Sequence, residues 1–287
     1  MVWRITRHLL AIAAIVLLGG LICATLVRFA PGFSVDEQQL DPRLSADSLR
    51  ALHESHQSER NILQFYAGYM KRAMHGDLGT SRSLNQPVSA LLHDRFPVTL
   101  HLVASGLALG WMIALGLSLT TVLVRVKVYS LLAIAVSGAF LCIPAAVLAL
   151  LSVMLNTPGY LAIAIIVFPK VFTYSRNLLE KAYSSPHIIA ARAKGLGELR
   201  ILVWHVLPVS APSLLALAGV SVSVALGAAI PIEALCGLAG VGDLAWQAAL
   251  GRDLPLLVNI TVLVTLLTML SNSGADVISH ALRGQES

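Results

Sequence analysis

The sequence is poor in charge, in aromatic residues and in cysteine. Only 12% of its 287 residues are charged and 6% are aromatic, whereas a soluble domain carries about 25% charged residues. Its three cysteines are an odd number without metal-ligand spacing, so we expect no disulfide framework. The sequence also lacks a Gly-x-x-x-x-Gly-Lys-Ser/Thr phosphate loop, so ATP hydrolysis by this chain is not expected.

Apolar sequence takes the place of the missing charge, since 56% of the residues are hydrophobic. This composition is typical of a chain whose surface faces lipid. The net charge of +5 raises the question of a nucleic-acid partner. The basic residues are better explained by membrane topology, as described below, and we expect no nucleic acid.

Stretches of about 20 residues without charge predict the membrane spans. The longest one contains Asn156-Thr157-Pro158-Gly159, a strong turn signal, and is divided there. The fourth span is the weakest, because it contains Lys170, which must face the bundle interior or reach toward the inner surface. An all-α polytopic membrane protein with about six transmembrane helices is therefore predicted, with spans near 9–27, 97–124, 128–155, 160–179, 206–232 and 254–277.

The N-terminal stretch resembles a secretory signal, because Arg4 and Arg7 precede an apolar run. The run has 19 uncharged residues, longer than the usual apolar region of about 7–15 residues in a signal peptide. We therefore expect an uncleaved first span.

The distribution of basic residues predicts the orientation. With the N-terminus in the cytoplasm, the short outer connections hold only Arg252. The inner segments hold Arg4, Arg7, Arg125, Lys127, Arg176, Lys181, Arg192, Lys194, Arg200 and Arg283. Because cytoplasmic loops are enriched in Lys and Arg, this bias predicts an even number of spans with both termini in the cytoplasm.

Two segments lie outside the predicted bilayer. The extracytoplasmic loop 28–96 contains helical spacing over 49–73, which fits a solvated linker, a helix packed on the bundle, or a docking surface for an external protein. In the cytoplasmic segment 180–205, Ser185-Pro186 is typical of a helix N-cap and first turn. Gly195 is typical of the residue that ends such a helix, and a second helix is expected from Glu198.

This segment resembles the cytoplasmic signature of the permease subunits of binding-protein-dependent ABC importers. That signature reads Glu-Ala-Ala, three residues, Gly, nine residues, then Ile-x-Leu-Pro. Matches at the right spacing are Ala190, Ala191, Gly195, Leu207 and Pro208, whereas Ile189 replaces the Glu and His205 replaces the Ile. The run Ala191–Leu196 is similar to the version found in the oligopeptide, dipeptide and nickel permeases.

Further segments resemble the same branch of the family. They are Pro31-Gly32 after the first span, Gly76–Ser81 with Pro87-Val88, Arg95–Leu100, and Gly240–Leu244 followed by Ala248 and Arg252–Pro255. The resemblance covers nearly the whole chain. It implies a type I-like transmembrane domain over residues 1–287 in the cell inner membrane.

The resemblance also implies the function and the partners. The chain would form half of an import pathway for di- or oligopeptides or a similar small solute, without catalysing a reaction itself. Its partners would be a second permease, two cytoplasmic ATPase subunits that bind ATP and magnesium, and an extracytoplasmic binding protein, and no cofactor would be bound by this chain. Coupling to the ATPases would use Ala190, Ala191, Arg192, Lys194, Gly195, Leu207 and Pro208, with Lys170 as a candidate pathway residue.

Three other interpretations remain open at this point. An ion-gradient-driven transporter would carry paired acids at the span centres and internal repeats, and we see neither. Gly240–Asp243 fits the Gly-x-Gly-Asp pattern of intramembrane aspartyl proteases, with Asp276 as the second carboxylate, although the predicted topology separates the two. A metal could be bound by four histidines of the loop, but their spacing is loose and solvated histidines are more common: His53, His56, His75 and His93.

Overall fold

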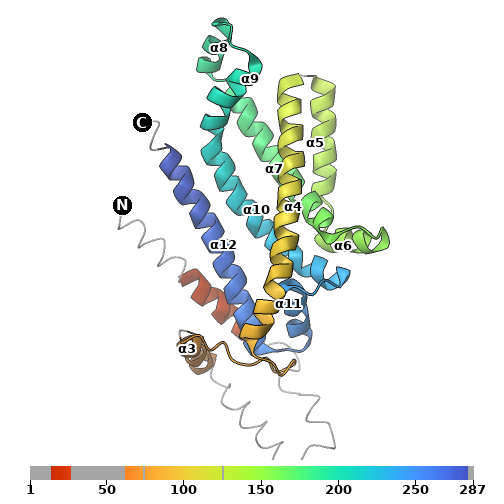
Figure 1. The fold of residues 1–287 in the computed structure, drawn as a ribbon, viewed down its shortest axis with the longest axis vertical. Helices are drawn as coiled ribbons and strands as arrows, with labels where there is room; N and C mark the ends of the chain where they lie inside the picture. The colour runs from red at the N-terminus through yellow and green to blue at the C-terminus, as the bar shows by residue number, and fades with distance from the viewer. Residues whose placement is uncertain (1–13, 27–61, 74, 125, 284–287) are drawn as a thin grey trace, which may run out of the picture. The chain divides into compact units, whose positions relative to one another are not determined.

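The computed structural model describes residues 14–26, 62–73, 75–124 and 126–283, and the regular secondary structure of these residues is α-helical, joined by turns and short connections (Figure 1). These residues contain no strand, only one isolated bridge between Thr80 and Pro87. The helices are Ala14–Leu26, α3 (Ile62–Ala73), α4 (Val88–Val124), α5 (Lys127–Leu141), α6 (Ala145–Met154), α7 (Gly159–Tyr183), α8 (Pro186–Ala193), α9 (Glu198–Ile201), α10 (Leu207–Cys236), α11 (Val241–Leu250) and α12 (Leu254–Arg283).

Four stretches in the described part of the chain are long and apolar enough to cross a membrane: Val88–Val124, Gly159–Tyr183, Glu198–Cys236 and Leu254–Ser279. The bent pair α5 and α6 and the shorter apolar helix Ala14–Leu26 add to them. The prediction of an all-α membrane protein with about six transmembrane helices agrees with this set. Residues 9–13 and 27 of the expected first span lie outside the described residues.

The expected third span differs from the structure. Residues 128–155 do not form one straight helix, because α5 and α6 meet at an angle of 93° (Figure 1). The bend lies at Cys142–Pro144, where Pro144 stands before the first residue of α6 with extended backbone. Proline has no N–H to donate and disfavours a helical conformation in the residue before it, so the first helix ends there. The proline was visible in the sequence, but apolar length alone concealed the break.

The helices also run beyond several predicted limits. Helix α4 begins at Val88, nine positions before the predicted 97, and contains Pro97. Helix α7 continues to Tyr183, beyond the predicted 179, and α10 continues to Cys236, beyond 232. The turn predicted at 156–159 lies between α6 and α7, where Asn156 has a φ of 51°.

We expected a single domain over residues 1–287, and the contacts divide the chain into two compact units. The first unit comprises residues 1–96 and 244–266, and the second comprises 97–243 and 267–287. In the first unit, Tyr66 and Tyr69 of α3 are buried with Ala24, Leu254 and Val258. Helix α3 therefore packs on apolar helices and is not a solvated linker. The remainder of the helical pattern predicted over 49–73 lies outside the described residues.

Buried polar contacts tie the segment between α3 and α4 to the start of α12. Asp253 is fully buried, and its carboxylate accepts hydrogen bonds from the hydroxyl of Ser81 at 2.5 Å and from the backbone N–H of Ser83 at 3.0 Å. The same carboxylate accepts the N–H of Leu256 at 3.1 Å and so caps the first turn of α12. The carboxylate of Asp253 thus accepts hydrogen bonds both from the loop before α4 and from the first turn of α12.

The second unit has two apolar clusters. The larger one packs α4, α5, α6, α7 and α10 around side chains such as Ile163, Phe172 and Ile232, which are completely buried. Close packing of α4 on α7 depends on Gly106, because a Cβ there would lie 2.6 Å from the Cβ of Ile163. Small residues at such contacts allow membrane helices to approach closely. The smaller cluster lies at one end of α7 and positions the candidate site.

Candidate functional site

Three short elements follow the end of α7 and lead into α10 (Figure 1). Helix α8 begins at Pro186, whose fixed φ and missing N–H suit the first turn. Ser185 occupies the N-cap position as predicted, but its hydroxyl does not cap α8. It donates instead to the carbonyl oxygen of Lys181 at 3.3 Å, so the start of α8 is held to the last turn of α7.

The end of α8 is fixed by a left-handed turn at Gly195. Gly195 has a φ of 77°, which residues with a Cβ rarely adopt. Its N–H donates to the carbonyl of Arg192 at 2.9 Å, and the N–H of Leu196 donates to the carbonyl of Ala191 at 3.3 Å. These two bonds form a Schellman motif. The chain then turns into α9, which begins at Glu198 as the sequence predicted.

Helix α8 buries one face against the bundle. Ile188 and Ala191 are buried in the smaller cluster with Leu179, Tyr183 and Ile201. Burying an isoleucine side chain is worth about 1.5–3 kcal/mol, so this inner face holds α8 on the bundle.

The opposite face of α8 is open to solvent. Ile189 is 62% exposed, and Ala190, Ala193 and Lys194 are exposed beside it. A short helix with a buried inner face and an apolar outer face with one charge is suited to contact another protein.

Arg192 is engaged within this segment. Its guanidinium donates to both carboxylate oxygens of Glu198, at 2.8 and 3.2 Å, and lies 5.6 Å from the ring centre of Tyr183. The ion pair joins α8 to α9 across the Gly195 turn, and the ring contact joins α8 to α7. Arg192 therefore stiffens the segment, whereas Lys194 is exposed.

A π-helical turn at Leu202–Val206 joins α9 to α10. Pro208 follows it, and because proline cannot donate a backbone hydrogen bond, the helical ladder is locally disturbed. Leu207 packs on the smaller cluster and Pro208 is exposed. Nδ1 of His205 is buried in this turn without a hydrogen-bond partner among the described residues.

All seven residues expected to couple to the ATPases thus lie on α8, on its C-terminal turn or at the first two positions of α10. Lys170 is separate from them. It is exposed on α7, 13 residues before Tyr183, which is about 20 Å along the helix axis.

A second polar site, at the other end of α10, was not found from the sequence. Glu233 is completely buried, and its Oε2 accepts the backbone N–H groups of Gly242 at 2.6 Å and Asp243 at 3.3 Å. The N–H of Val241 donates to the hydroxyl oxygen of Thr99 at 2.7 Å. These acceptors satisfy N–H groups in the first turn of α11, which have no partner within that helix.

The glycines of Gly240–Asp243 are explained by this carboxylate. A Cβ on Gly240 would collide with the carboxyl group of Glu233, and one on Gly242 would lie 2.7 Å from Cα of Ile230. The Gly-x-Gly-Asp pattern therefore reflects space for a buried acid. Glu233 could have been noticed in the sequence as an acidic residue one position beyond the predicted end of the fifth span.

The histidines considered as metal ligands do not form a site in the described residues. His75 and His93 make contacts to neighbours in sequence, and no group of three potential ligands is found in the ranges that the structure describes. His53 and His56 lie outside those ranges.

Comparison with known proteins gives a family for the chain. Residues 106–284 match the family described as "Binding-protein-dependent transport system inner membrane component". The oligopeptide transport system permease protein OppB of Escherichia coli (strain K12) is 28% identical over 281 residues, covering 88% of this chain and 89% of that protein. A putative peptide transport system permease protein of Brucella abortus (strain 2308) is 26% identical over 230 residues, covering 71% of this chain and 73% of that protein.

A solved structure shares the fold. The MetNI methionine ABC transporter in an inward-facing conformation matches with a TM-score of 0.61 at 20% identity, covering 68% of this chain and 97% of the matched chain. The family match covers more than half of the sequence and includes the whole α8–α10 site. This chain therefore belongs to the binding-protein-dependent transport system inner membrane components, the multi-pass permease subunits of ABC importers.

Proposed function

We propose that this chain forms half of the pathway through which an ATP-driven importer moves di- or oligopeptides, or a similar small solute, across the inner membrane. The peptide class is supported by two relatives named as peptide permeases, one of which aligns over 88% of this chain. The other half of the pathway is contributed by a second, similar permease. An extracytoplasmic protein delivers the solute.

The observation that carries the proposal is that α8 is fixed to the bundle on one face and exposed on the other. Its inner face is fixed by Ile188 and Ala191, its end is fixed by Gly195, and its outer face leaves Ile189 and Lys194 exposed. A stiff, short helix of this kind transmits force when a partner binds its outer face. We assign that partner as the cytoplasmic ATPase, which binds ATP and magnesium, so this chain needs no cofactor and catalyses no reaction.

Within this assignment the basic residues have different roles. Arg192 holds α8 against α9 through Glu198, and Lys194 contacts the ATPase. Ala190 lies at the centre of the contact. Leu207 and Pro208 connect the segment to the span that follows.

Lys170 is assigned to the pathway or to the interface with the second permease. It is exposed in the middle of α7, and a charge facing lipid at that depth costs about 2.5–3.5 kcal/mol on insertion scales. A second subunit or a water-filled path removes that cost. Lys170→Met is expected to lower peptide uptake while the variant still assembles, and unchanged uptake would remove Lys170 from the pathway.

Cysteine crosslinking tests the coupling assignment. The exposed cysteine of the wild type, Cys142, and the half-buried Cys23 and Cys236 are first replaced by serine. Ala190→Cys in this background is expected to crosslink to the ATPase subunit in the assembled importer, and to react with an impermeant maleimide only from the cytoplasmic side.

The matched control is Thr157→Cys, which lies just before the opposite end of α7 and is also exposed. It is expected to react from the outer side and to give no ATPase crosslink. Labelling of Ala190→Cys from outside would overturn both the orientation and the coupling role. Uptake driven by an ion gradient in vesicles without ATP would favour a secondary transporter instead.

A further inference from the structure

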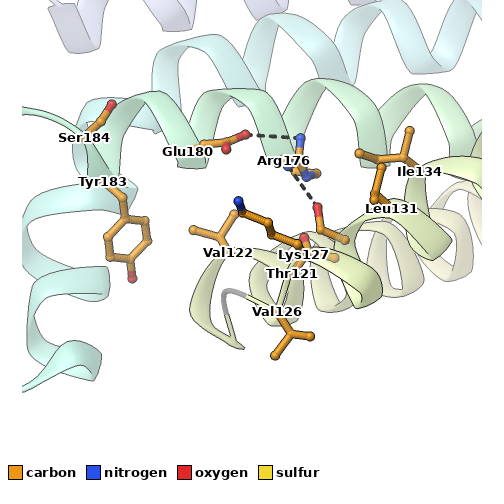
Figure 2. A pocket seen from close by; sticks show the side chains of 11 residues that line it. Thr121, Val122, Val126, Lys127, Leu131, Ile134, Arg176, Glu180, Tyr183 and Ser184 are labelled. Carbon is orange, nitrogen blue, oxygen red and sulfur yellow. Dashed lines mark hydrogen bonds and ion pairs between the residues drawn. The ribbon is translucent and has the colours of Figure 1, made fainter.

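A cavity of about 630 Å³ opens between the ends of α4, α5 and α7 in the second unit (Figure 2). Figure 2 shows Lys127 and Arg176 extending from α5 and α7 toward the same space, with Glu180 beside them. Tyr183, the last residue of α7, also lines the cavity. The cavity thus lies at the end of the bundle that leads into α8.

The polar wall of the cavity carries an excess of positive charge. Arg176 donates to the hydroxyl of Ser130 at 3.0 Å and forms an ion pair with Glu180 at 3.1 Å. Its Nε is buried and has no hydrogen-bond partner among the described residues. Lys127 is exposed at the rim. Two cations therefore face a single carboxylate, which is itself 60% exposed and so only partly offsets them.

The start of α5 adds further hydrogen-bond donors to this wall. Val126 stands at the N-cap position and offers no side-chain hydrogen bond to the first turn. The first intrahelical bond is made by the N–H of Ser130 to the carbonyl of Val126. The preceding N–H groups and the positive end of the helix dipole, together with the positive charges of Lys127 and Arg176, favour an oxyanion.

The remaining wall of the cavity is apolar. Leu131 is 66% exposed and Ile134 is 43% exposed on α5, and both line the cavity. A free inorganic anion would make no favourable contact with the apolar wall. A molecule with a charged head and a hydrocarbon tail can contact both the basic wall and the apolar wall. Tyr129 at the start of α5 and the exposed Tyr174 on α7 are aromatic residues of the kind enriched at the membrane surface.

We propose that this cavity binds the headgroup of an anionic phospholipid, with the phosphate between Lys127, Arg176 and the first turn of α5 and one acyl chain along Leu131 and Ile134. Basic pockets between membrane helices on the cytoplasmic side recognise such headgroups. The choice of the cytoplasmic leaflet rests on the orientation in the proposed function, whereas the binding itself does not.

Native mass spectrometry of the purified full-length chain tests the proposal. Phosphatidylglycerol and phosphatidylcholine are titrated separately, and the wild type is expected to bind one phosphatidylglycerol with clear preference. Each basic side chain near an anionic lipid contributes about fivefold in affinity. The double variant Lys127→Gln, Arg176→Gln is therefore expected to lose about 25-fold, with phosphatidylcholine binding unchanged.

The matched control is Lys181→Gln, an exposed lysine on α7 that does not line the cavity, and it is expected to retain wild-type affinity. If the double variant does not fold, Lys127→Gln alone is measured, with an expected loss of about fivefold. Equal affinity for the two lipids, an equal loss in Lys181→Gln, or displacement of the lipid by millimolar inorganic phosphate would each overturn the proposal. Because the assay needs no ATPase, its failure is distinguishable from failure of the coupling assignment.

Discussion

Replacing Gly195 by alanine separates the coupling role that we propose for α8 from its contribution to stability. Gly195 has a φ of 77°, and a Cβ built there meets nothing within 4 Å. The cost is therefore one of backbone conformation alone, about 1–2 kcal/mol for the left-handed region. Alanine recovers roughly 0.4–1 kcal/mol by restricting the unfolded chain. The net loss is about 1 kcal/mol, small against a typical stability of about 5–15 kcal/mol.

Gly237 provides a matched control. It ends α10 with a φ of 65°, and a Cβ there also meets nothing within 4 Å. Gly195→Ala and Gly237→Ala should therefore lower the midpoint of thermal unfolding by similar amounts. Only Gly195→Ala disturbs the Schellman turn of α8, so only that variant should transport less solute per ATP hydrolysed in proteoliposomes.

Asparagine at the same position sharpens the test, because it enters the left-handed region more readily than alanine. Gly195→Asn should recover much of the coupling that Gly195→Ala loses. The reasoning is refuted if all three variants show the same ratio of uptake to ATP hydrolysis, since the geometry of the turn would then not matter for coupling.

Two further predictions concern stability. Glu233→Ala leaves the buried N–H groups at the start of α11 without their acceptor and should lower the free energy of unfolding by about 1–3 kcal/mol. Glu233→Gln retains a carbonyl oxygen and should lower it less. Thermal unfolding of the purified chain measures both, and an alanine variant as stable as the wild type would contradict the capping role. Gly106→Leu must push α4 away from Ile163 and should lower the free energy of unfolding by about 1–3 kcal/mol. The control Gly116→Leu places its side chain in open space and should be tolerated. Equal melting temperatures for the two variants would show that the close approach of α4 and α7 does not contribute to stability.

The sequence predicted the features that depend on local chemistry. Pro186 and Gly195 mark the two ends of α8, because proline has a fixed φ that suits the first turn of a helix and glycine adopts the left-handed φ that other residues rarely adopt. The apolar runs predicted the long helices for a similar reason, since backbone groups in lipid must be satisfied within the helix. The predicted helix ends were wrong where polar residues continue a helix beyond the apolar run, as at the start of α4 (Val88) and the end of α7 (Tyr183).

The features that the sequence did not give depend on tertiary contacts. Arg192 is equally consistent with an external partner and with Glu198, and only the fold of the Gly195 turn brings that carboxylate within 2.8 Å. The hydroxyl of Ser185 could either accept a backbone N–H of the first turn of α8 or donate to a carbonyl at the end of α7, and in the fold it donates to Lys181. Glu233 was passed over because an acid beside an apolar run marks a span boundary, whereas its burial depends on the two glycines folding back over it.

The run from Glu198 to Cys236 is helical without interruption, and 39 residues make a rod of about 58 Å. Glu198 at one end of the rod forms the ion pair with Arg192, and Glu233 near the other end accepts a hydrogen bond from the start of α11. If the proposed ATPase contact turns the first end, this helix carries the turn toward the second, and the π-helical turn at Leu202–Val206 is a place where part of it can be absorbed. Converting that turn into regular α-helix would therefore be expected to stiffen the connection between α8 and the start of α11.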